Sequence, residues 1–480
     1  MISIIATISK NAGVGYDVSQ FPLDYFHRID ILTEDGVLVM GRITWDALPE
    51  DVITLLCNPY SNRTILVLTT RTTFHFNMDK MQNIVKFVSP KNIDDVLTKK
   101  QHKDVFILGG ESLYAMFIDR AQRIYASIQV QAVQAGGMFP IQGLKNFHIV
   151  HYSDPTHIVY ERITSCKDHN NHGEHAYLNI LTDILNEGKA REDRTKVGTV
   201  AVFGRQMRFD ISKSVPLLTT KAMGWKSIIE ELLWFLQGKT DSKILENKKI
   251  NIWKGNTTRE FLDNRGLHSY EEGDTGPMYG FQWRHMGAEY KGAAHDYKTP
   301  THQGHDQIAW LINQLRTDPY NRRHMITTYN PLDVEKGVLA PCHGIVVQFY
   351  VEDVVKENQS KHTIFDNRKR LSCHVYNRSQ DSFLGMPYNI FSYAVLVHII
   401  AKFTDMKPCE LIISTGDTHI YSNHMEQCQE QIKRTPMPFP VLNIKDAVLK
   451  KSNGIDDLTI DDFELIGYIS HPAIRAPMAV

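Results

Sequence analysis

The sequence predicts an α/β protein with two domains, and three observations carry this prediction. The chain has 480 residues, which exceeds the length of one typical domain. Short apolar runs recur along it, separated by polar stretches or by segments with helical periodicity. A polar tract over 165–174 has the composition of a linker. We therefore expect a first domain over residues 1–164, a short linker over 165–174 and a second domain over 175–480.

Composition argues against several classes of protein. The 53 Lys and Arg residues balance 54 Asp and Glu residues, which disfavours a dominant nucleic-acid or membrane surface. The six cysteines are scattered without metal-ligand spacing, so we expect reduced thiols in the cytoplasm and no metal site. His169, His172 and His175 could suggest a metal cluster, but no acid or thiol set accompanies them and a polar connector is favoured.

Neither the N-terminus nor the longest apolar run indicates a secretion signal or a membrane span. Met1 to Ala6 has no basic region before it and looks like a first strand rather than a signal peptide. The longest apolar run, around Tyr393 to Ile400, is too short to cross a bilayer.

The first domain contains five short apolar runs, which predict buried strands in a mostly parallel sheet with flanking helices. Ligands bind such sheets at the carboxyl ends of the strands. Two of these ends are rich in glycine: Gly41 to Trp45, and Gly109-Gly110 before a helix over Glu111 to Ile118. Both could hold phosphate groups, although Gly109-Gly110 alone could be just a tight turn. The predicted strands are Ile2 to Ile8, Val37 to Met40, Thr64 to Leu68, Val105 to Leu108 and Ile124 to Val130.

Residues 1 to 150 resemble dihydrofolate reductase, a family that reduces dihydrofolate with NADPH. The matching pieces are Ile4 to Ala6, Gly13-Val-Gly15, Pro22-Leu-Asp24, Gly41-Arg-x-Thr-Trp45, Asn62-Arg63, Ile107 to Gly110 with Tyr114, and Phe139-Pro140.

The resemblance implies a role for each matching residue. Asp24 would bind the pterin and support protonation, because burial raises the pKa of a carboxyl group. Arg63 would grip the glutamate tail of folate, and Ser127 stands where the family usually has a threonine. Ile5 and Tyr114 would also contact folate. The dinucleotide would be held by Ala6, Thr7, Gly13, Gly15, Gly41, Arg42, Thr44, Thr69, Gly109 and Gly110.

One segment departs from this family. The usual Pro-Trp before the acid is replaced by Val18 to Phe21, in the loop that normally closes over the nicotinamide. Hydride transfer could therefore be slow or lost, which leaves a non-catalytic folate-binding or subunit-binding scaffold as an alternative. The less favoured alternative for Asp24 is an ordinary residue at the start of a helix.

The second domain offers a candidate nucleophile. Cys342 lies at the mouth of a predicted buried strand over Gly344 to Tyr350. A thiol attacks only as the thiolate, so we expect nearby arginines to lower its pKa. The alternative is a simply buried cysteine.

A candidate acid lies on a predicted helix over Trp225 to Gln237. Glu231 borders its apolar face, where partial burial would raise the pKa of the carboxyl group and suit it to proton transfer. A side chain that reaches solvent is the alternative.

Other elements are predicted around these two residues. Gly276 to Arg284 suits a turn that enters a strand, and a helix ends before Arg322 and Arg323. Asn389 could cap a buried helix over Ile390 to Phe403. His419 and Tyr421 lie on the same side of an extended segment and form a plausible hydroxyl-binding pair.

Residues 175 to 480 closely resemble thymidylate synthase, which methylates dUMP with 5,10-methylenetetrahydrofolate as carbon donor and reductant. The matching strings are Asp193-Arg-Thr, Glu230 to Gly238, Gly276-Pro-x-Tyr-Gly, Asn321-Arg-Arg323, Ala340-Pro-Cys-His343, Asn377-Arg-Ser379, Phe383 to Asn389 and Gly416 to Tyr421.

This resemblance implies the chemistry of the second domain. Cys342 would attack C6 of the uracil, Glu231 and Tyr279 would manage protons, and Asn389 would read the uracil edge. A hydroxymethylase on the same fold is disfavoured, because a cytosine-processing relative usually has aspartate at that position. Trp253, Asn256 and Asp381 would face the folate. The other expected dUMP-binding residues are Arg194, His343, Asn377, Arg378, Ser379, Asp381, His419 and Tyr421, with Arg322 and Arg323 from the partner subunit of a homodimer.

Asn377 is a departure, because the family normally has glutamine before the Arg-Ser pair. The shorter side chain predicts longer hydrogen bonds near Cys342 and weakened synthase activity. Together the two resemblances imply a fused enzyme in which the reductase regenerates the folate that the synthase oxidises.

Overall fold

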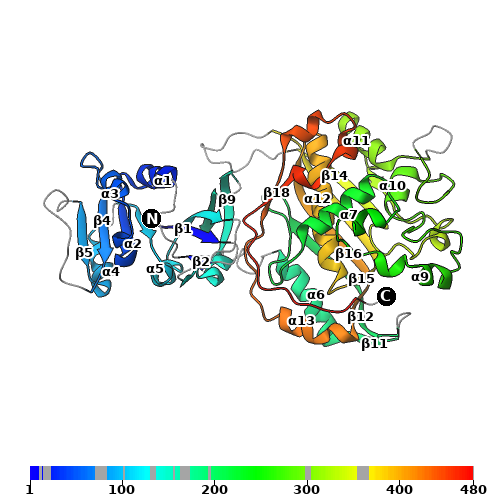
Figure 1. The fold of residues 1–480 in the computed structure, drawn as a ribbon, viewed down its shortest axis with the longest axis horizontal. Coiled ribbons are helices and arrows are strands. Elements are labelled where there is room, and N and C mark those ends of the chain that lie inside the picture. Colours follow the sequence, from blue (N-terminus) through cyan, green and yellow to red (C-terminus); the bar gives the residue numbers. More distant parts are fainter. Residues whose placement is uncertain are drawn as a thin grey trace. The chain divides into compact units, whose positions relative to one another are not determined.

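Two compact units make up the chain in the computed structural model (Figure 1). The first holds Met1–Asn170 with Ile466–Ile469, and the second holds Asn171–Leu465 with Ser470–Val480. Each unit is considered by itself below. The structure describes residues 1–9, 13–14, 23–70, 84–100, 103–129, 137–154, 157–162, 173–192, 196–297, 304–353 and 367–478.

The first unit is built on an eight-stranded sheet with the order β5-β4-β3-β6-β1-β7-β10-β9. Neighbours from β5 to β7 pair in parallel, and β10 and β9 close one edge antiparallel. The predicted mostly parallel sheet is confirmed. The strands are β1 (Ile2–Ser9), β3 (Val37–Gly41), β4 (Thr64–Leu68), β5 (Val85–Val88), β6 (Val105–Leu108), β7 (Arg123–Gln129), β9 (Phe147–Asp154) and β10 (His157–Arg162), with β2 (Gly13–Val14) and β8 (Gly137–Met138) paired separately.

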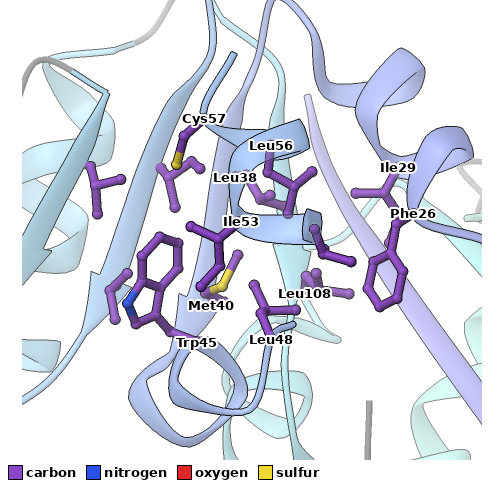
Figure 2. Close-up of a cluster of buried hydrophobic side chains, with 14 of the residues drawn as sticks. Phe26, Ile29, Leu38, Met40, Trp45, Leu48, Ile53, Leu56, Cys57 and Leu108 are labelled. Atoms are coloured by element: carbon purple, nitrogen blue, oxygen red, sulfur yellow. The ribbon is translucent and has the colours of Figure 1, made fainter. Parts of the chain in front are cut away.

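One face of this sheet carries the apolar core shown in Figure 2. Phe26 and Ile29 project from one helix, and Trp45 and Ile53 from two others, onto buried side chains such as Met40 of β3. Parallel strands are covered on both faces, so their sequences read as continuous apolar runs and were predictable from them. The helices are α1 (Leu23–Thr33), α2 (Arg42–Asp46), α3 (Glu50–Leu56), α4 (Ile93–Thr98) and α5 (Glu111–Phe117).

The second unit is organised around a six-stranded sheet with the order β11-β12-β16-β15-β14-β13. The central pair, β15 and β16, is parallel, and the other described neighbours are antiparallel. The carboxyl ends of β15 and β16 therefore lie at the same edge as the start of β14. The strands are β11 (Lys189–Arg191), β12 (Thr199–Asp210), β13 (Met325–Ile326), β14 (Val346–Glu352), β15 (Arg370–Asp381) and β16 (Lys407–Tyr421), with β17 (Val441–Ile444) and β18 (Phe463–Ile466) forming a small second sheet.

Helix α12 is the buried spine that the sequence predicted. Its side chains are buried nearly all round, and it packs against β15, β16 and α7, near the middle of this unit in Figure 1. The helices are α6 (Glu174–Glu187), α7 (Trp225–Leu236), α8 (Lys243–Glu246), α9 (Arg259–Asn264), α10 (Gly280–His285), α11 (Gln307–Thr317), α12 (Gly385–Phe403) and α13 (Met425–Gln431).

Two local predictions are wrong. The segment after Gly276 forms α10 instead of a strand, and its first four residues, Gly280 to Trp283, are all buried. Helix α12 begins at Gly385, so Asn389 lies inside it and cannot be its cap. Pro387 is tolerated there because a proline in the first turn costs no intrahelical hydrogen bond.

Within the ranges that the structure describes, no helix is long and apolar enough to cross a membrane. Within the same ranges, no group of three or more His, Cys, Asp or Glu side chains could hold a metal ion.

Candidate active sites

In the second unit, Cys342 lies four residues before β14, at the sheet edge where β15 and β16 end. The Tyr279 hydroxyl is 3.3 Å from Cys342 Sγ, and the Cys342 N–H donates to the same oxygen at 3.0 Å. Because that oxygen already accepts from the backbone, its own proton is free to point at sulfur. Ser379 N–H donates to Cys342 O at 3.2 Å, which ties the loop to β15.

The pKa of the Cys342 thiol is shifted in the direction opposite to the expected one. Burial raises the pKa of its thiol, while the Tyr279 hydrogen bond and the positive charge of Arg378 lower it only in part. The predicted net lowering of the pKa is therefore not seen. Arg378 also donates from Nε to Pro341 O at 3.3 Å, so its guanidinium is held beside the nucleophile.

Glu231 has the character that its helical position predicted. Its Oε1 accepts a hydrogen bond from the Trp253 indole at 2.9 Å. Burial raises the pKa of this carboxyl group to about 7, and the indole bond offsets only part of the rise. The expected upward shift is confirmed, so Glu231 can exchange a proton near neutral pH. Asn256 ends the short 3-10 turn that follows Trp253.

His343 is held neutral between two tyrosines. Its ring stacks on Tyr279 with centroids 4.4 Å apart, and its Nδ1 lies 2.8 Å from the Tyr393 hydroxyl. Burial lowers the pKa of His343 to about 3. A neutral imidazole can donate at one nitrogen and accept at the other, so the Tyr393 contact decides which nitrogen is left for a ligand.

Asn377, Gln380 and Asn389 form one buried amide network. Asn377 Oδ1 accepts from Gly344 N at 2.9 Å, and its Nδ2 donates to Gln380 Oε1 at 2.7 Å. The same Gln380 oxygen accepts from Asn389 Nδ2 at 3.3 Å. The shorter Asn377 side chain is therefore bonded at both its oxygen and its nitrogen, and the expected lengthening of its hydrogen bonds is not seen. The network fixes the orientation of the Asn389 amide.

The remaining expected nucleotide-binding residues lie at four separate places in the chain. His419 and Tyr421 end β16 with ring centroids 5.3 Å apart, and His419 Nδ1 is 2.9 Å from Asp417 Oδ1. Asp381 uses Oδ1 to accept from Phe383 N and Leu384 N, which shapes the turn into α12. Arg322 and Arg323 lie on an exposed turn before β13 and make no ion pair with any residue that the structure describes. Arg194 lies outside the described residues.

Sequence reasoning missed three buried polar residues here. Gln380 and Tyr393 carry the hydrogen bonds above, and Lys221 donates from Nζ to Phe383 O at 2.6 Å while lying over the Phe383 ring. Burial lowers the pKa of Lys221 to about 8. The alternation of buried and exposed side chains along β15 could have predicted that Gln380 is buried. Hydrogen-bond partners that come from three different elements cannot be predicted from sequence spacing.

In the first unit, a cavity of about 1050 Å³ opens at the carboxyl ends of β3, β4 and β6. This volume suits a large ligand. The lining includes most of the residues expected to hold a dinucleotide: Thr7, Gly41, Arg42, Thr44, Thr69, Gly109 and Gly110, together with Tyr114.

The glycines of this cavity differ in what surrounds them. A Cβ on Gly109 would lie 2.7 Å from Leu113 Cδ1, so this glycine is needed for close packing of α5. A Cβ on Gly110 would meet no atom within 4 Å, which leaves open space beside the chain. Tyr114 donates to Ile5 O at 2.9 Å and accepts from Gly109 N at 3.3 Å, so it fixes the strand ends.

Arg63 does not face this cavity. Its side chain is 0% exposed and forms an ion pair with Asp30 at 2.7 Å. It also donates to Thr33 Oγ1 at 2.8 Å and to Leu56 O at 2.5 Å. The guanidinium therefore ties α1 and α3 to β4. It could bind a ligand carboxylate only if its ion pair with Asp30 were broken.

Several expected residues of this unit are described in part or not at all. Asp24 belongs to α1 by its backbone, but its side chain lies outside the described part. Gly13 belongs to β2, and Gly15 lies outside the described residues. Ala6 is buried in β1. Ser127 lies on β7 in direct register with Thr7.

Comparison with known proteins assigns both units. The family described as thymidylate synthase matches residues 175–480, and the family described as dihydrofolate reductase matches residues 1–162. The bifunctional dihydrofolate reductase-thymidylate synthase of Paramecium tetraurelia is 34% identical over 100% of this chain and 98% of its own length. The chain belongs to the bifunctional dihydrofolate reductase–thymidylate synthase family. The protein of that name from Zea mays is also 34% identical, over 99% of this chain and 96% of its own.

The synthase half has more similar relatives. The thymidylate synthase of Herpesvirus ateles is 46% identical over 64% of this chain and 99% of its own length. The chain is thus an enzyme of two activities: reductive methylation of dUMP with 5,10-methylenetetrahydrofolate, and NADPH-dependent reduction of dihydrofolate. Full-length relatives favour both activities over the alternative of a synthase with a retired reductase scaffold.

Proposed function

We propose that Cys342 is the nucleophile of dUMP methylation. It would attack C6 of the uracil and make C5 an enolate carbon that accepts the one-carbon unit. The position of Cys342 at the meeting of three strand ends, with the Tyr279 hydroxyl 3.3 Å from its sulfur, is the single observation that carries this assignment. Because burial raises the pKa of the thiol, the phosphate-binding arginines must act with substrate present to favour the thiolate.

Protons would be handled by a set of neutral groups. Glu231, with a pKa of about 7, is the group that can give and take a proton at working pH. Tyr279 and the neutral His343 would carry hydrogen bonds between Glu231 and the uracil. Trp253, Asn256 and Asp381 would face the folate, and the fixed amide of Asn389 would read the uracil edge.

Phosphate binding supports a homodimer. Arg378 donates a hydrogen bond to Pro341 O and Ser379 N–H donates to Cys342 O, with Asn377 before them on β15. His419 and Tyr421 would hold the ribose hydroxyl. Arg322 and Arg323, exposed and without an ion pair among described residues, would reach the phosphate of the partner subunit. Arg194 would complete the phosphate set.

Mixed dimers test this sharing of residues. Co-expression of Cys342→Ser with Arg323→Ala should restore methylation, because one site then has an intact cysteine and intact partner arginines. If Arg323 acted within its own chain, the mixture would stay inactive.

In the first unit, NADPH supplies the hydride and the residues of the cavity position the reactants. Arg42 and Thr44, with the open space at Gly110, are suited to a phosphate-bearing cofactor, and the unpartnered Thr7 hydroxyl is suited to a polar ligand group. Ile5, Tyr114 and Ser127 would contact folate, with Asp24 as the acid. Gly13, Gly15, Gly41, Ala6, Thr69 and Gly109 would shape the cofactor side.

The arrangement of the chain completes the proposal. The reductase domain would span 1–164 and the synthase domain 175–480, with 165–174 as linker, in a cytoplasmic protein with reduced cysteines. The deciding experiment follows NADPH oxidation with dihydrofolate and methylation of dUMP on the same preparation of full-length protein. Both should proceed. Methylation without NADPH oxidation would leave a synthase that carries an inactive reductase fold.

A further inference from the structure

Helix α12 brings a second polar side chain to the synthase site, one turn after Asn389. Tyr393 follows Asn389 by four residues, so both side chains project from the same face of the helix. The Tyr393 side chain is buried, with 2% exposed, and its hydroxyl lies 2.8 Å from His343 Nδ1. This hydroxyl makes no other hydrogen bond with a residue that the structure describes. The imidazole is therefore the partner of a buried phenol.

The direction of this hydrogen bond follows from what each group can do. A nitrogen of a neutral imidazole either donates or accepts, whereas a phenol can do both. If His343 Nδ1 donated, the proton of Tyr393 would need another acceptor, and the structure describes none for it. A buried donor without an acceptor is costly, so Tyr393 donates and Nδ1 accepts. The proton of the neutral imidazole is then on Nε2.

Both partners keep these roles at working pH. Burial raises the pKa of Tyr393 well above its ordinary value, so the phenol stays protonated. Burial lowers the pKa of His343 to about 3, so the imidazole stays neutral. The hydrogen bond therefore joins a neutral donor to a neutral acceptor.

Two further contacts hold the ring and the hydroxyl in place. The His343 ring stacks on Tyr279 with 20° between the planes, which fixes the plane of the ring but not the position of its proton. A Cβ on Gly344 would overlap the Tyr393 hydroxyl. Because residue 344 is a glycine, the hydroxyl can lie against the backbone next to His343 and reach Nδ1.

The opposite nitrogen of the ring is left for a ligand. His343 Nε2 makes no hydrogen bond with any residue in the part of the chain that the structure describes. The ring is partly exposed, and Nε2 is not one of the buried polar atoms that lack a partner. The ring also stacks on the tyrosine whose hydroxyl lies 3.3 Å from Cys342 Sγ, so Nε2 belongs to the surroundings of the nucleophile.

We propose that Tyr393 is a positioning residue of dUMP methylation: its hydrogen bond holds His343 in the tautomer with the proton on Nε2, so that the imidazole offers a donor to the bound nucleotide. This role rests on the proposed role of Cys342. When its sulfur bonds to C6, the electron pair of the C5–C6 double bond moves toward C4 and its carbonyl oxygen. The Nε2–H group donates a hydrogen bond to that oxygen, directly or through a water, and gives up no proton.

Nitrogen-15 chemical shifts of the full-length protein test the tautomer directly. In protein labelled at its histidine nitrogens, the His343 signals are those that His343→Gln lacks. Nδ1 should have the shift of an unprotonated nitrogen and Nε2 that of a protonated one. In Tyr393→Phe the two shifts should move toward each other, because Nδ1 loses its donor and the tautomers mix.

Kinetics test whether Tyr393 acts through His343. Tyr393→Phe should lower kcat of dUMP methylation by about 5-fold, the effect of one neutral hydrogen bond, and change the KM for dUMP by less than about 2-fold. The amide of His343→Gln has no tautomers, so adding Tyr393→Phe to it should change kcat by less than about 2-fold. Equal losses in both backgrounds would mean that the Tyr393 hydroxyl acts independently of the imidazole, and would overturn the proposal.

Tyr297→Phe is the matched control. Tyr297 is buried in the same unit, and its hydroxyl bonds to Lys291 N at 2.7 Å and to Gly292 O at 3.1 Å. The variant should leave kcat and the His343 shifts at the parent values. It separates the loss of any buried hydroxyl from the loss of control over the tautomer.

Failure of this role and failure of the proposed function give different results. A parent spectrum with a protonated Nδ1, or with a mixture of both tautomers, would overturn the role of Tyr393 while methylation of dUMP stands. The parent spectrum decides this even if Tyr393→Phe does not fold. A parent protein that does not methylate dUMP would overturn the roles of Cys342 and Tyr393 together.

Discussion

The two active sites of this chain treat their polar groups in opposite ways. Around Cys342 the protein satisfies them itself: Tyr279, Glu231 and His343 each have a protein partner at 2.8–3.3 Å. In the reductase cavity, Thr7 Oγ1 has no described partner and the space beside Gly110 is open. A site whose groups are pre-bonded loses function when one of them is removed, while a site that awaits its ligand loses mainly affinity.

The largest effect expected from this contrast follows removal of the nucleophile. Cys342→Ser should reduce dUMP methylation by at least about 10⁴-fold, because no other described thiol lies at the meeting of the strand ends. NADPH oxidation with dihydrofolate by the same preparation should be unchanged. Residual methylation above about 1% of the parent rate would contradict the assignment of Cys342.

The acid of the synthase is the next most sensitive group. Glu231→Gln keeps the shape of the side chain and should lower kcat by about 10²- to 10⁴-fold. With the pKa of Glu231 raised to about 7, its protonated form is lost as the pH rises through 7, so kcat/KM of the parent should fall above that pH. The glutamine variant should lack this alkaline limb, and a parent profile that is flat from pH 6 to 8.5 would sink the assignment.

Much of this contrast could be predicted from the sequence, because it depends on patterns among residues that are close together in the chain. The buried strands of the first unit appeared as apolar runs, and Glu231 was found because 3.6-residue spacing placed it on an apolar margin. The direction of the Cys342 pKa shift could not be predicted from the sequence, because it depends on how deeply the loop before β14 is buried. The segment after Gly276 was misread as extended, since the burial of Trp283 on α10 is a tertiary effect.

Long-range polar partners were the harder part. Arg63 matched a family position, yet its ion pair with Asp30 joins residues 33 positions apart, which no spacing rule connects. Gln380 links Asn377 of the same strand to Asn389 of α12, because its Oε1 accepts a hydrogen bond from each of the two amides. Such networks can be inferred only once the elements are placed.

A substitution in the amide network of Asn377 should have an effect of intermediate size on the synthase site. Asn377 is 0% exposed and is bonded at both its oxygen and its nitrogen, so the longer side chain of Asn377→Gln should overpack the site. We expect a loss of about 1–3 kcal/mol in stability and no gain in methylation rate. Denaturant unfolding and initial rates measure the two effects. A faster enzyme of unchanged stability would restore the view that the shorter Asn377 weakens the synthase.

The smallest expected effect is in the reductase unit and concerns Arg63, a buried cation that already has an ion pair. Asp30→Asn removes the charge that holds Arg63 while keeping a hydrogen-bond acceptor. If Arg63 serves the glutamate tail of folate, its release should lower the KM for dihydrofolate by about 2- to 5-fold and leave the KM for a pterin without the tail unchanged. Asp35→Asn, at an exposed position of the same unit, is the matched control. KM values that stay at the parent level for both substrates in Asp30→Asn would mean that Arg63 is a structural residue, and that the reductase unit also satisfies part of its charge with its own residues.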